Sequence, residues 1–161
     1  MRKYSIFKKL IWVITVLWMC MIFYFSHQPG EVSRMESGKI LHKMDLIQEN
    51  DINTVDNYEV LSLQRVIRKW AHKIIYFTLG ILFVLSIINT RFTNIVTYLI
   101  SFIAATVYGA TDELHQMFVP GRGPLLSDVF LDSVSALTGV VFIAVIIELL
   151  KKTKFDLKKF I

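Results

Sequence analysis

Four long apolar runs dominate this sequence, and they limit the folds available to it more than any other feature. The runs cover residues 10–25, 74–88, 95–110 and 134–150. Each is somewhat shorter than the roughly 20 residues that a helix needs to cross a bilayer core. Polar residues at the ends of each run must therefore complete the crossing, which places those residues near the membrane surface.

We predict an all-α fold: a polytopic membrane helical bundle with about four transmembrane helices, in a single domain covering residues 1–161. The spans are expected at about residues 10–26, 73–90, 94–112 and 130–150. The chain is 54% hydrophobic and its mean hydropathy is +0.52, as is typical of integral membrane proteins. The first run contains Trp12 and Trp18 and is followed by no Ala-x-Ala-like cleavage site, so it is predicted to be a retained span.

The charge of the chain points to the membrane as its partner. The net charge is +5, and the basic residues flank the apolar runs. This pattern is typical of topology signals and of contact with anionic lipids, so membrane lipids are expected partners and nucleic acid is not. The single cysteine, Cys20, excludes an intramolecular disulfide and a thiolate metal site.

Lys and Arg residues near the ends of the runs predict the orientation. They gather before the first run, in the link 89–94 and in the C-terminal tail: Arg2, Lys3, Lys8, Lys9, Arg91, Lys151, Lys152, Lys154, Lys158 and Lys159. With four spans these regions share one side, so both termini are expected in the cytoplasm. Residues 27–73 and 114–127 then lie outside, although the first of these segments carries several basic residues of its own.

The segment between the first two runs is predicted to be partly helical. Pro29 and Gly30 interrupt the first helix. After Ser33, apolar residues recur near helical spacing among charges, which favours an amphipathic extracytoplasmic helix on the outer face or over the bundle: Met35, Ile40, Leu41, Met44 and Ile47. Residues 50–57 are expected to form a loop, and residues 60–69 a helix that runs into the second span.

Polar side chains interrupt the apolar pattern along three lines, each at helical spacing. The lines are Arg65, Lys69, His72 and Tyr76 in the second span, Tyr108, Asp112, His115 and Gln116 in the third, and Asp128, Asp132 and Ser135 in the fourth, with Gly139 one turn further. Under the predicted topology all three lie at the outer ends of their helices. Ionisable groups at the edge of hydrocarbon cost a few kcal/mol each, so we interpret the convergence as a site.

Several members of these lines also have a structural interpretation. His72 could donate a hydrogen bond to a neighbouring helix, and Tyr76 and Tyr108 could be ordinary interface aromatics. In this interpretation the polar cluster only holds the helices together. Ala104, Ala105 and Gly109 allow close packing of the third helix.

The fourth helix and the turn before it leave similar alternatives open. Asp128 could be the N-cap of that helix, with Ser127 as the alternative cap. Asp132 lies about one turn inside the helix and needs a partner, which either Arg122 or His72 could supply. Arg122 could instead anchor the turn or bind lipid phosphate.

The residue types allow three kinds of chemistry. A divalent metal could be bound, with His72, Asp112 and His115 as weak ligand candidates, but no His-Glu-x-x-His motif is present and no cofactor is predicted. Carboxylates and histidines could perform general acid–base catalysis on a lipid-linked substrate, with these candidates: His72, Asp112, Glu113, His115 and Asp132. Arg122 with Arg68 or Lys69 could hold a phosphate or carboxylate. His27 and His42 are isolated and are left out of the site.

Two motifs and a shorter segment contain most of these polar residues. They read Ile67-Arg68-Lys69-x-Ala71-His72-x-x-x-Tyr76-x-x-Leu79-Gly80, then Asp112-Glu113-x-His115-Gln116-x-Phe118-Val119-Pro120-Gly121-Arg122 followed by Asp128-Val129, and Ser26-x-Gln28-Pro29-Gly30. Together they cover the chain from Ser26 to the fourth span and resemble the VanZ-like membrane protein family. Asp132 departs from the resemblance, which leads us to expect Asn there, and so does Ser135, where Gly or Ala is expected.

The resemblance implies a small multi-pass protein of the bacterial cell membrane, in a family named for resistance to the glycopeptide teicoplanin. It suggests a lipid-linked envelope precursor or a lipoglycopeptide near the outer leaflet as partner. We therefore expect a protein that binds or modifies an amphiphilic ligand there and affects glycopeptide susceptibility. A hydrolase or transferase acting on a lipid-linked precursor, and a structural scaffold, are the alternatives. A transporter is disfavoured because the middle of each span is nearly free of charge.

The expected ligand-binding residues come from all three lines and from the turn. They are Arg68, Lys69, His72, Tyr76, Asp112, Glu113, His115, Gln116, Arg122, Asp128 and Asp132.

Overall fold

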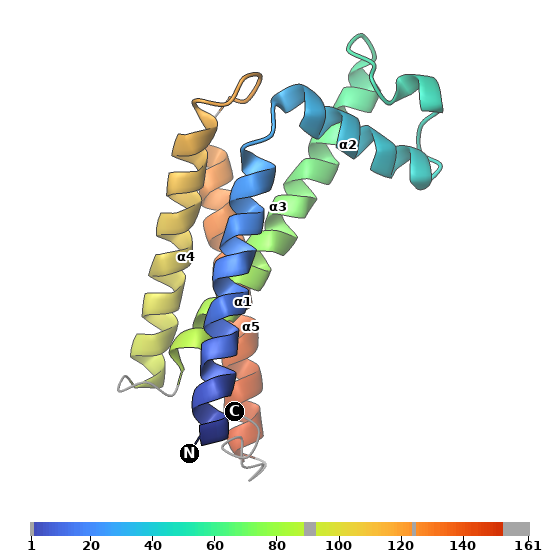
Figure 1. Ribbon diagram of the computed structural model, residues 1–161. Helices are drawn as coiled ribbons and strands as arrows, with labels where there is room; N and C mark the ends of the chain where they lie inside the picture. The colour runs from blue at the N-terminus through green and yellow to red at the C-terminus, as the bar shows by residue number, and fades with distance from the viewer. Residues whose placement is uncertain (1, 89–92, 124, 153–161) are drawn as a thin grey trace.

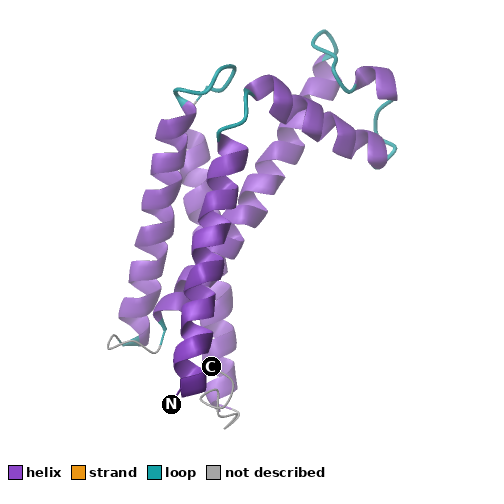
Figure 2. Ribbon diagram, in the orientation of Figure 1, coloured by secondary structure: helices purple, strands orange, loops and turns teal. Residues whose placement is uncertain are grey.

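The protein is all-helical in the part of the chain that the computed structural model describes, residues 2–88, 93–123 and 125–152. The elements are α1 (Arg2–Ser26), α2 (Gly30–Lys43), a 3-10 turn η1 (Glu49–Asp51), α3 (Tyr58–Ile87), α4 (Asn94–Gln116) and α5 (Leu126–Lys152). Figures 1 and 2 show α1, α3, α4 and α5 side by side, with the start of α1 and the end of α5 at the same end of the bundle. The predicted fold class is confirmed. Arg91, Lys154, Lys158 and Lys159 lie outside the described residues.

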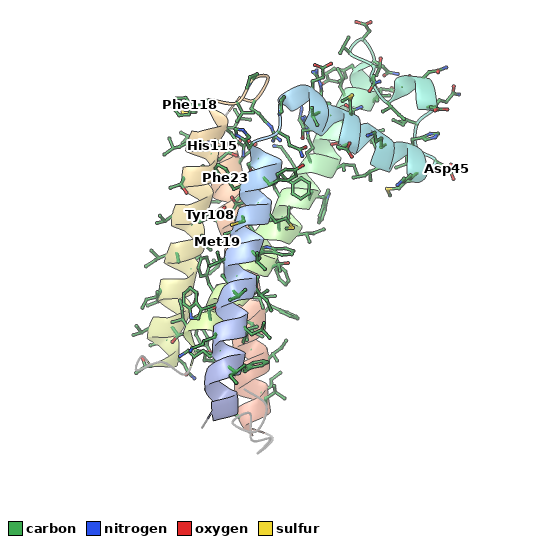
Figure 3. All side chains as sticks on the ribbon, in the orientation of Figure 1. Met19, Phe23, Asp45, Tyr108, His115 and Phe118 are labelled. Atoms are coloured by element: carbon green, nitrogen blue, oxygen red, sulfur yellow. The ribbon has the colours of Figure 1, made fainter. Side chains whose placement is uncertain are left out.

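Four of the helices are long and apolar enough to cross a membrane: Ile6–Ser26, Tyr58–Ile87, Asn94–Gln116 and Leu126–Lys151. The shortest of these spans has 21 residues, which at 1.5 Å per residue reaches across a hydrocarbon core of about 30 Å. Each extends beyond its apolar run into polar residues, as predicted. Their outward side chains are apolar, for example Leu17, Ile74 and Val107, which are exposed (Figure 3). The chain is a multi-pass membrane protein.

α3 and α5 form the closest helix pair of the bundle. A Cβ atom at Gly80 would lie 2.3 Å from the carbonyl oxygen of Ala136, and one at Gly139 would lie 2.0 Å from that of Phe77. Only glycine permits backbones to approach so closely. Below the polar end, a core that includes Ile22, Tyr76, Leu79, Phe83, Ala105 and Ala136 joins these helices to α1 and α4.

α2 and the first half of α3 extend past the bundle on one side (Figure 1). α3 begins at Tyr58, where the side chain of Asn57 accepts hydrogen bonds from Glu59 N and Val60 N, at 3.1 and 3.3 Å. It then continues without a break into the membrane span. This confirms the helix predicted at 60–69, and η1 with the turns after it takes the place of the predicted loop at 50–57.

The helix expected after Ser33 has different ends and a different buried face. It begins at Gly30, directly after Pro29, and ends at Lys43 because Asp45 adopts φ +57 and Leu46 N donates to Leu41 O. Met44 and Ile47 therefore lie outside it. Its buried residues are Gly30, Ser37, Gly38 and Leu41, whereas Ile40 is exposed.

Candidate functional site

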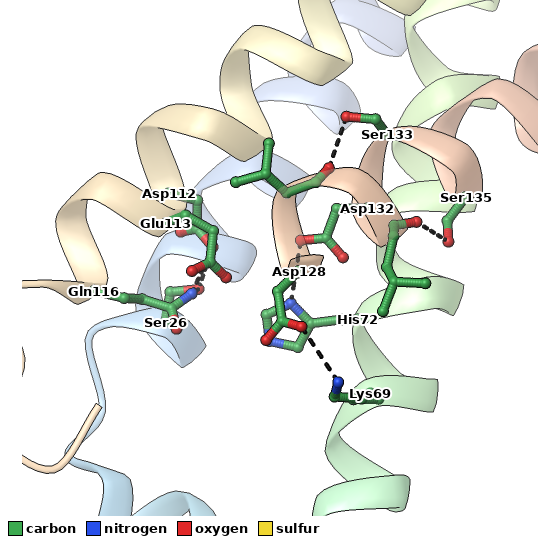
Figure 4. Close-up of polar contacts among 12 residues, drawn as sticks. Ser26, Lys69, His72, Asp112, Glu113, Gln116, Asp128, Asp132, Ser133 and Ser135 are labelled. Atoms are coloured by element: carbon green, nitrogen blue, oxygen red, sulfur yellow. Dashed lines mark hydrogen bonds and ion pairs between the residues drawn. The ribbon is translucent and has the colours of Figure 1, made fainter. Parts of the chain in front are cut away.

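The three polar lines meet at the end of the bundle opposite the two termini. Figure 4 shows Asp112, Glu113 and Gln116 of α4 facing the end of α1 and the first turns of α5, with His72 and Lys69 of α3 on the other side. The polar groups do not form one cluster. They divide into a closed network beside α1 and an open cavity beside α3.

The closed network is centred on Asp112, which is buried. Ser26 Oγ donates to Asp112 Oδ2 at 2.7 Å, and Gln116 Nε2 donates to the same oxygen at 3.1 Å. Gln116 lies one helical turn after Asp112, so α4 presents both side chains to the last residue of α1. The network joins α1 to α4. Ser26 was not among the predicted site residues.

Arg122 ties the turn after α4 to the end of α1. Its Nη2 donates to Phe25 O at 3.0 Å and its Nε to Gln28 O at 3.2 Å, while Nη1 lies 3.5 Å from Gln116 Oε1. A cation at the C-terminal end of a helix is favoured by the helix dipole. Burial lowers the pKa of the Arg122 guanidinium, and Asp112 and Glu113 oppose this; the group stays charged. The anchoring role considered for Arg122 is therefore present in the structure.

The same turn is held by its backbone. Gly30 N donates to Pro120 O at 3.0 Å, and Gly121 adopts φ +71. A Cβ atom on Gly30 would lie 2.0 Å from Gly121 O. Glycine at these two positions lets the turn lie directly against the junction of α1 and α2, and this fixes Arg122 in place.

On the other side of Arg122 lies a cavity of about 290 Å³. It is lined by residues of α3, α4, the turn and α5: Arg65, Arg68, Lys69, His72, Glu113, Gln116, Gly121, Arg122, Gly123, Leu125, Asp128, Leu131 and Asp132. Eight of the eleven expected ligand-binding residues line it. Arg65 belongs to the predicted line on α3 but was not among them.

One ion pair and one histidine–carboxylate contact connect α3 with α5 at this cavity (Figure 4). Lys69 Nζ lies 3.4 Å from Asp128 Oδ1, and His72 Nδ1 lies 3.5 Å from Asp132 Oδ2. His72 is thus the partner that Asp132 was expected to need. Asp128 is not the N-cap, because α5 begins at Leu126 and Asp128 lies in its first turn.

Four arginines lie near one another beside the cavity, and none of them forms an ion pair among the described residues. Arg34 of α2, Arg65 and Arg122 are all close enough to Arg68 to repel its positive charge. Within the described residues, none of these four arginines has a carboxylate oxygen within 4.0 Å. Such a group of guanidinium ions suits an anion with several oxygen atoms.

Glu113 faces the cavity from α4. Its carboxyl group is buried, and Oε2 accepts a hydrogen bond from Leu125 N at 3.4 Å. This contact connects the end of α4 to the residue just before α5. Glu113 therefore helps to hold the cavity wall in place.

His115 lies outside the cavity. Its Nε2 is 3.0 Å from Nδ1 of His27, and Phe23 packs against the His115 ring with centroids 4.6 Å apart. Figure 3 labels His115 and Phe23 beside one another. His27, which was left out as isolated, is thus the partner of His115. His42 instead contacts Ile47 O at 3.2 Å, away from the polar end.

Tyr76 belongs to the buried core of the bundle, and Tyr108 is half-buried and packs against that core. Tyr76 is fully buried beneath the polar end, stacked on the His72 ring with centroids 6.2 Å apart. Its hydroxyl and Asp112 Oδ1 are buried, and neither has a hydrogen-bond partner among the residues that the structure describes. Tyr108 donates to Met19 O at 2.6 Å and joins α4 to α1.

No group of three or more His, Cys, Asp or Glu side chains in the described part of the chain has the geometry to hold a metal ion. Of the three weak ligand candidates, His72 faces Asp132, His115 faces His27 and Asp112 accepts from Ser26.

A family model described as VanZ/LLP1 matches residues 11–148 of the chain. No curated protein and no solved structure matches it. The matched range contains both the closed network and the cavity.

Proposed function

Because the chain belongs to the VanZ/LLP1 family and is a multi-pass membrane protein, we propose that it binds the anionic head group of a membrane amphiphile in the polar cavity. The observation that supports this proposal is the group of four arginines, none of which has a carboxylate of the described residues within ion-pair distance. The positive charges of these neighbouring guanidinium groups repel one another. A bound phosphate group would offset this repulsion with its negative charge and would accept paired hydrogen bonds from the guanidinium N–H groups.

The location of the cavity suits an amphiphile better than a free solute. It lies at one end of a membrane-spanning bundle, and apolar side chains of α3 and α5 such as Trp70, Leu126 and Phe130 are exposed. A lipid could place its head group among the arginines while its chains stay beside these residues. The distribution of Lys and Arg supports an orientation with this end at the outer leaflet of a bacterial cell membrane and both termini in the cytoplasm.

A lipid-linked envelope precursor or a lipoglycopeptide has the required chemistry, and binding of either would change susceptibility to teicoplanin. If so, expression of the wild type raises the inhibitory concentration of teicoplanin, and expression of a variant with Arg65→Gln and Arg68→Gln does not. If both proteins raised the inhibitory concentration equally, teicoplanin resistance would not depend on the arginines of the cavity.

Binding itself is tested on purified protein by native mass spectrometry with dioleoyl phosphatidic acid, using phosphatidylcholine as the neutral competitor. We expect the wild type to retain phosphatidic acid selectively and the Arg65→Gln, Arg68→Gln variant to lose that selectivity. Inorganic phosphate in a parallel arm distinguishes a lipid site from a free-anion site, because only the latter is blocked by phosphate alone. Equal retention of phosphatidic acid by wild type and variant would reject the proposal.

The closed network favours a second, structural role for the other half of the polar end. Asp112 and three of the N–H groups of Arg122 are engaged by other parts of the protein. We assign these residues to the joining of α1, α4 and the turn, and the ligand contacts to Arg65, Arg68 and Lys69.

A further inference from the structure

His72 is the only histidine among the residues that line the cavity. One of its ring nitrogens, Nδ1, faces the carboxylate of Asp132 at 3.5 Å, and Asp132 is itself only 3% exposed. The ring also stacks on Tyr76, with an interplanar angle of 25°. Two neighbours on different helices thus fix how the imidazole is oriented.

The second nitrogen, Nε2, makes no hydrogen bond to any residue that the structure describes. A carboxylate at Nδ1 holds that nitrogen as the N–H donor and leaves Nε2 with a free lone pair. The same pair of groups stabilises the imidazolium that forms when Nε2 takes a proton. A fixed base beside a group of arginines is an arrangement suited to phosphoryl transfer to water, in which catalysis consists mainly of positioning and charge stabilisation.

We propose that this protein hydrolyses the phosphate ester or diphosphate of a membrane lipid, with His72 as the general base. The inference rests on the proposed anion site. Water attacks phosphorus and forms the new O–P bond, while the bond from that phosphorus to the leaving oxygen breaks. The leaving oxygen is the lipid oxygen in a monoester and the oxygen between the two phosphorus atoms in a diphosphate. His72 Nε2 accepts the proton of that water and then gives it to the leaving oxygen. The products are the lipid alcohol, or lipid monophosphate, and inorganic phosphate.

Other side chains at this end of the bundle are less suited to start the reaction. Ser133 Oγ donates to Val129 O and Ser135 Oγ to Leu131 O, both at 2.7 Å, so these hydroxyls are bound to their own helix (Figure 4). Ser26 donates to Asp112 in the closed network. These contacts favour direct attack by water over a serine nucleophile.

The test is phosphate release by purified full-length protein in mixed micelles, with dioleoyl phosphatidic acid and dioleoylglycerol diphosphate as probes. We expect turnover by the wild type and a loss of about 10²–10⁴-fold in His72→Ala. Added imidazole should restore part of the lost activity in this variant, which a purely structural role would not allow. His42→Ala, a histidine variant far from the cavity, should keep wild-type turnover.

Asp132→Asn tests the positioning role, because it preserves the shape of the side chain but removes its charge. It should lower kcat with little change in KM. Binding of phosphatidic acid by wild type without phosphate release from either probe would overturn the hydrolysis and leave the binding site standing. Absence of both binding and release would reject both proposals. Full activity in His72→Ala, or loss in His115→Ala alone, would overturn the assignment of the base.

Discussion

Ser26 and Arg68 lie at the same end of the bundle but have opposite electrostatic surroundings. The Ser26 hydroxyl is buried and donates to Asp112 Oδ2 at 2.7 Å. The Arg68 guanidinium lies among three other arginines and has no carboxylate of the described residues within ion-pair distance. A satisfied buried group stabilises the fold, whereas unbalanced charge is tolerated where a ligand balances it. For single residues, the charged and polar neighbours of a side chain thus distinguish structural residues from binding residues.

Ser26→Ala should destabilise the protein without affecting the cavity. The substitution removes a hydrogen bond to a buried carboxylate, for which we expect a loss of about 1–3 kcal/mol of unfolding free energy. The measurement is equilibrium unfolding of purified protein in detergent. Ser62→Ala is the matched control, because the Ser62 hydroxyl only donates to Glu59 O on an exposed part of α3. Equal stability of both variants would mean that the network contributes nothing to the fold.

Among the elements, the turn between α4 and α5 connects the two halves of the polar end. On one side Arg122 and Pro120 bind the junction of α1 and α2; on the other side Gly121 and Gly123 line the cavity. Displacement of this turn would therefore disturb both halves together. α3 and α5 form the opposite wall, and their close contact holds His72 opposite Asp132.

Gly139→Ala should be among the most disruptive single substitutions in the bundle. The added Cβ would lie 2.0 Å from Phe77 O, so α3 and α5 must move apart. Overpacking of this kind typically costs about 1–3 kcal/mol, and rigid backbone atoms allow little relief. Thermal unfolding gives the comparison with Gly123→Ala, where a Cβ would meet nothing within 4 Å. A Gly139→Ala protein as stable as Gly123→Ala would contradict the helix contact described.

The apolar runs were enough to predict the spans, and helical spacing was enough to predict the three polar lines. The predicted topology then placed all three lines at one end of the bundle. It could not predict the division into two halves, because the neighbour of each line depends on how the helices are ordered around the bundle. Asp112 and Asp132 look alike in sequence, yet Asp112 faces α1 and Asp132 faces α3. Ser26 and His27 were missed for the same reason, since nothing local indicates that the end of α1 packs on α4.

At the scale of the whole molecule, binding of an outer-leaflet ligand requires that the cavity lie on the outer side of the membrane. The prediction is checked with single cysteines in a Cys20→Ser background, at Ser127→Cys beside the cavity and Lys151→Cys at the other end of α5, both exposed positions. A membrane-impermeant thiol reagent added to intact cells should label the first and not the second. The reverse pattern would place the cavity at the cytoplasmic leaflet.

The division of the polar end into a structural network and an anion-binding cavity is tested by melting temperatures. They are measured for wild type, Arg68→Gln and Ser26→Ala in neutral detergent, with and without dioleoyl phosphatidic acid. A ligand that binds only the folded state raises the melting temperature according to its affinity. We predict the same upward shift for wild type and Ser26→Ala, although Ser26→Ala starts from a lower value, and no shift for Arg68→Gln. A full shift in Arg68→Gln, or its loss in Ser26→Ala, would contradict the division of the polar end into a structural network and an anion-binding cavity.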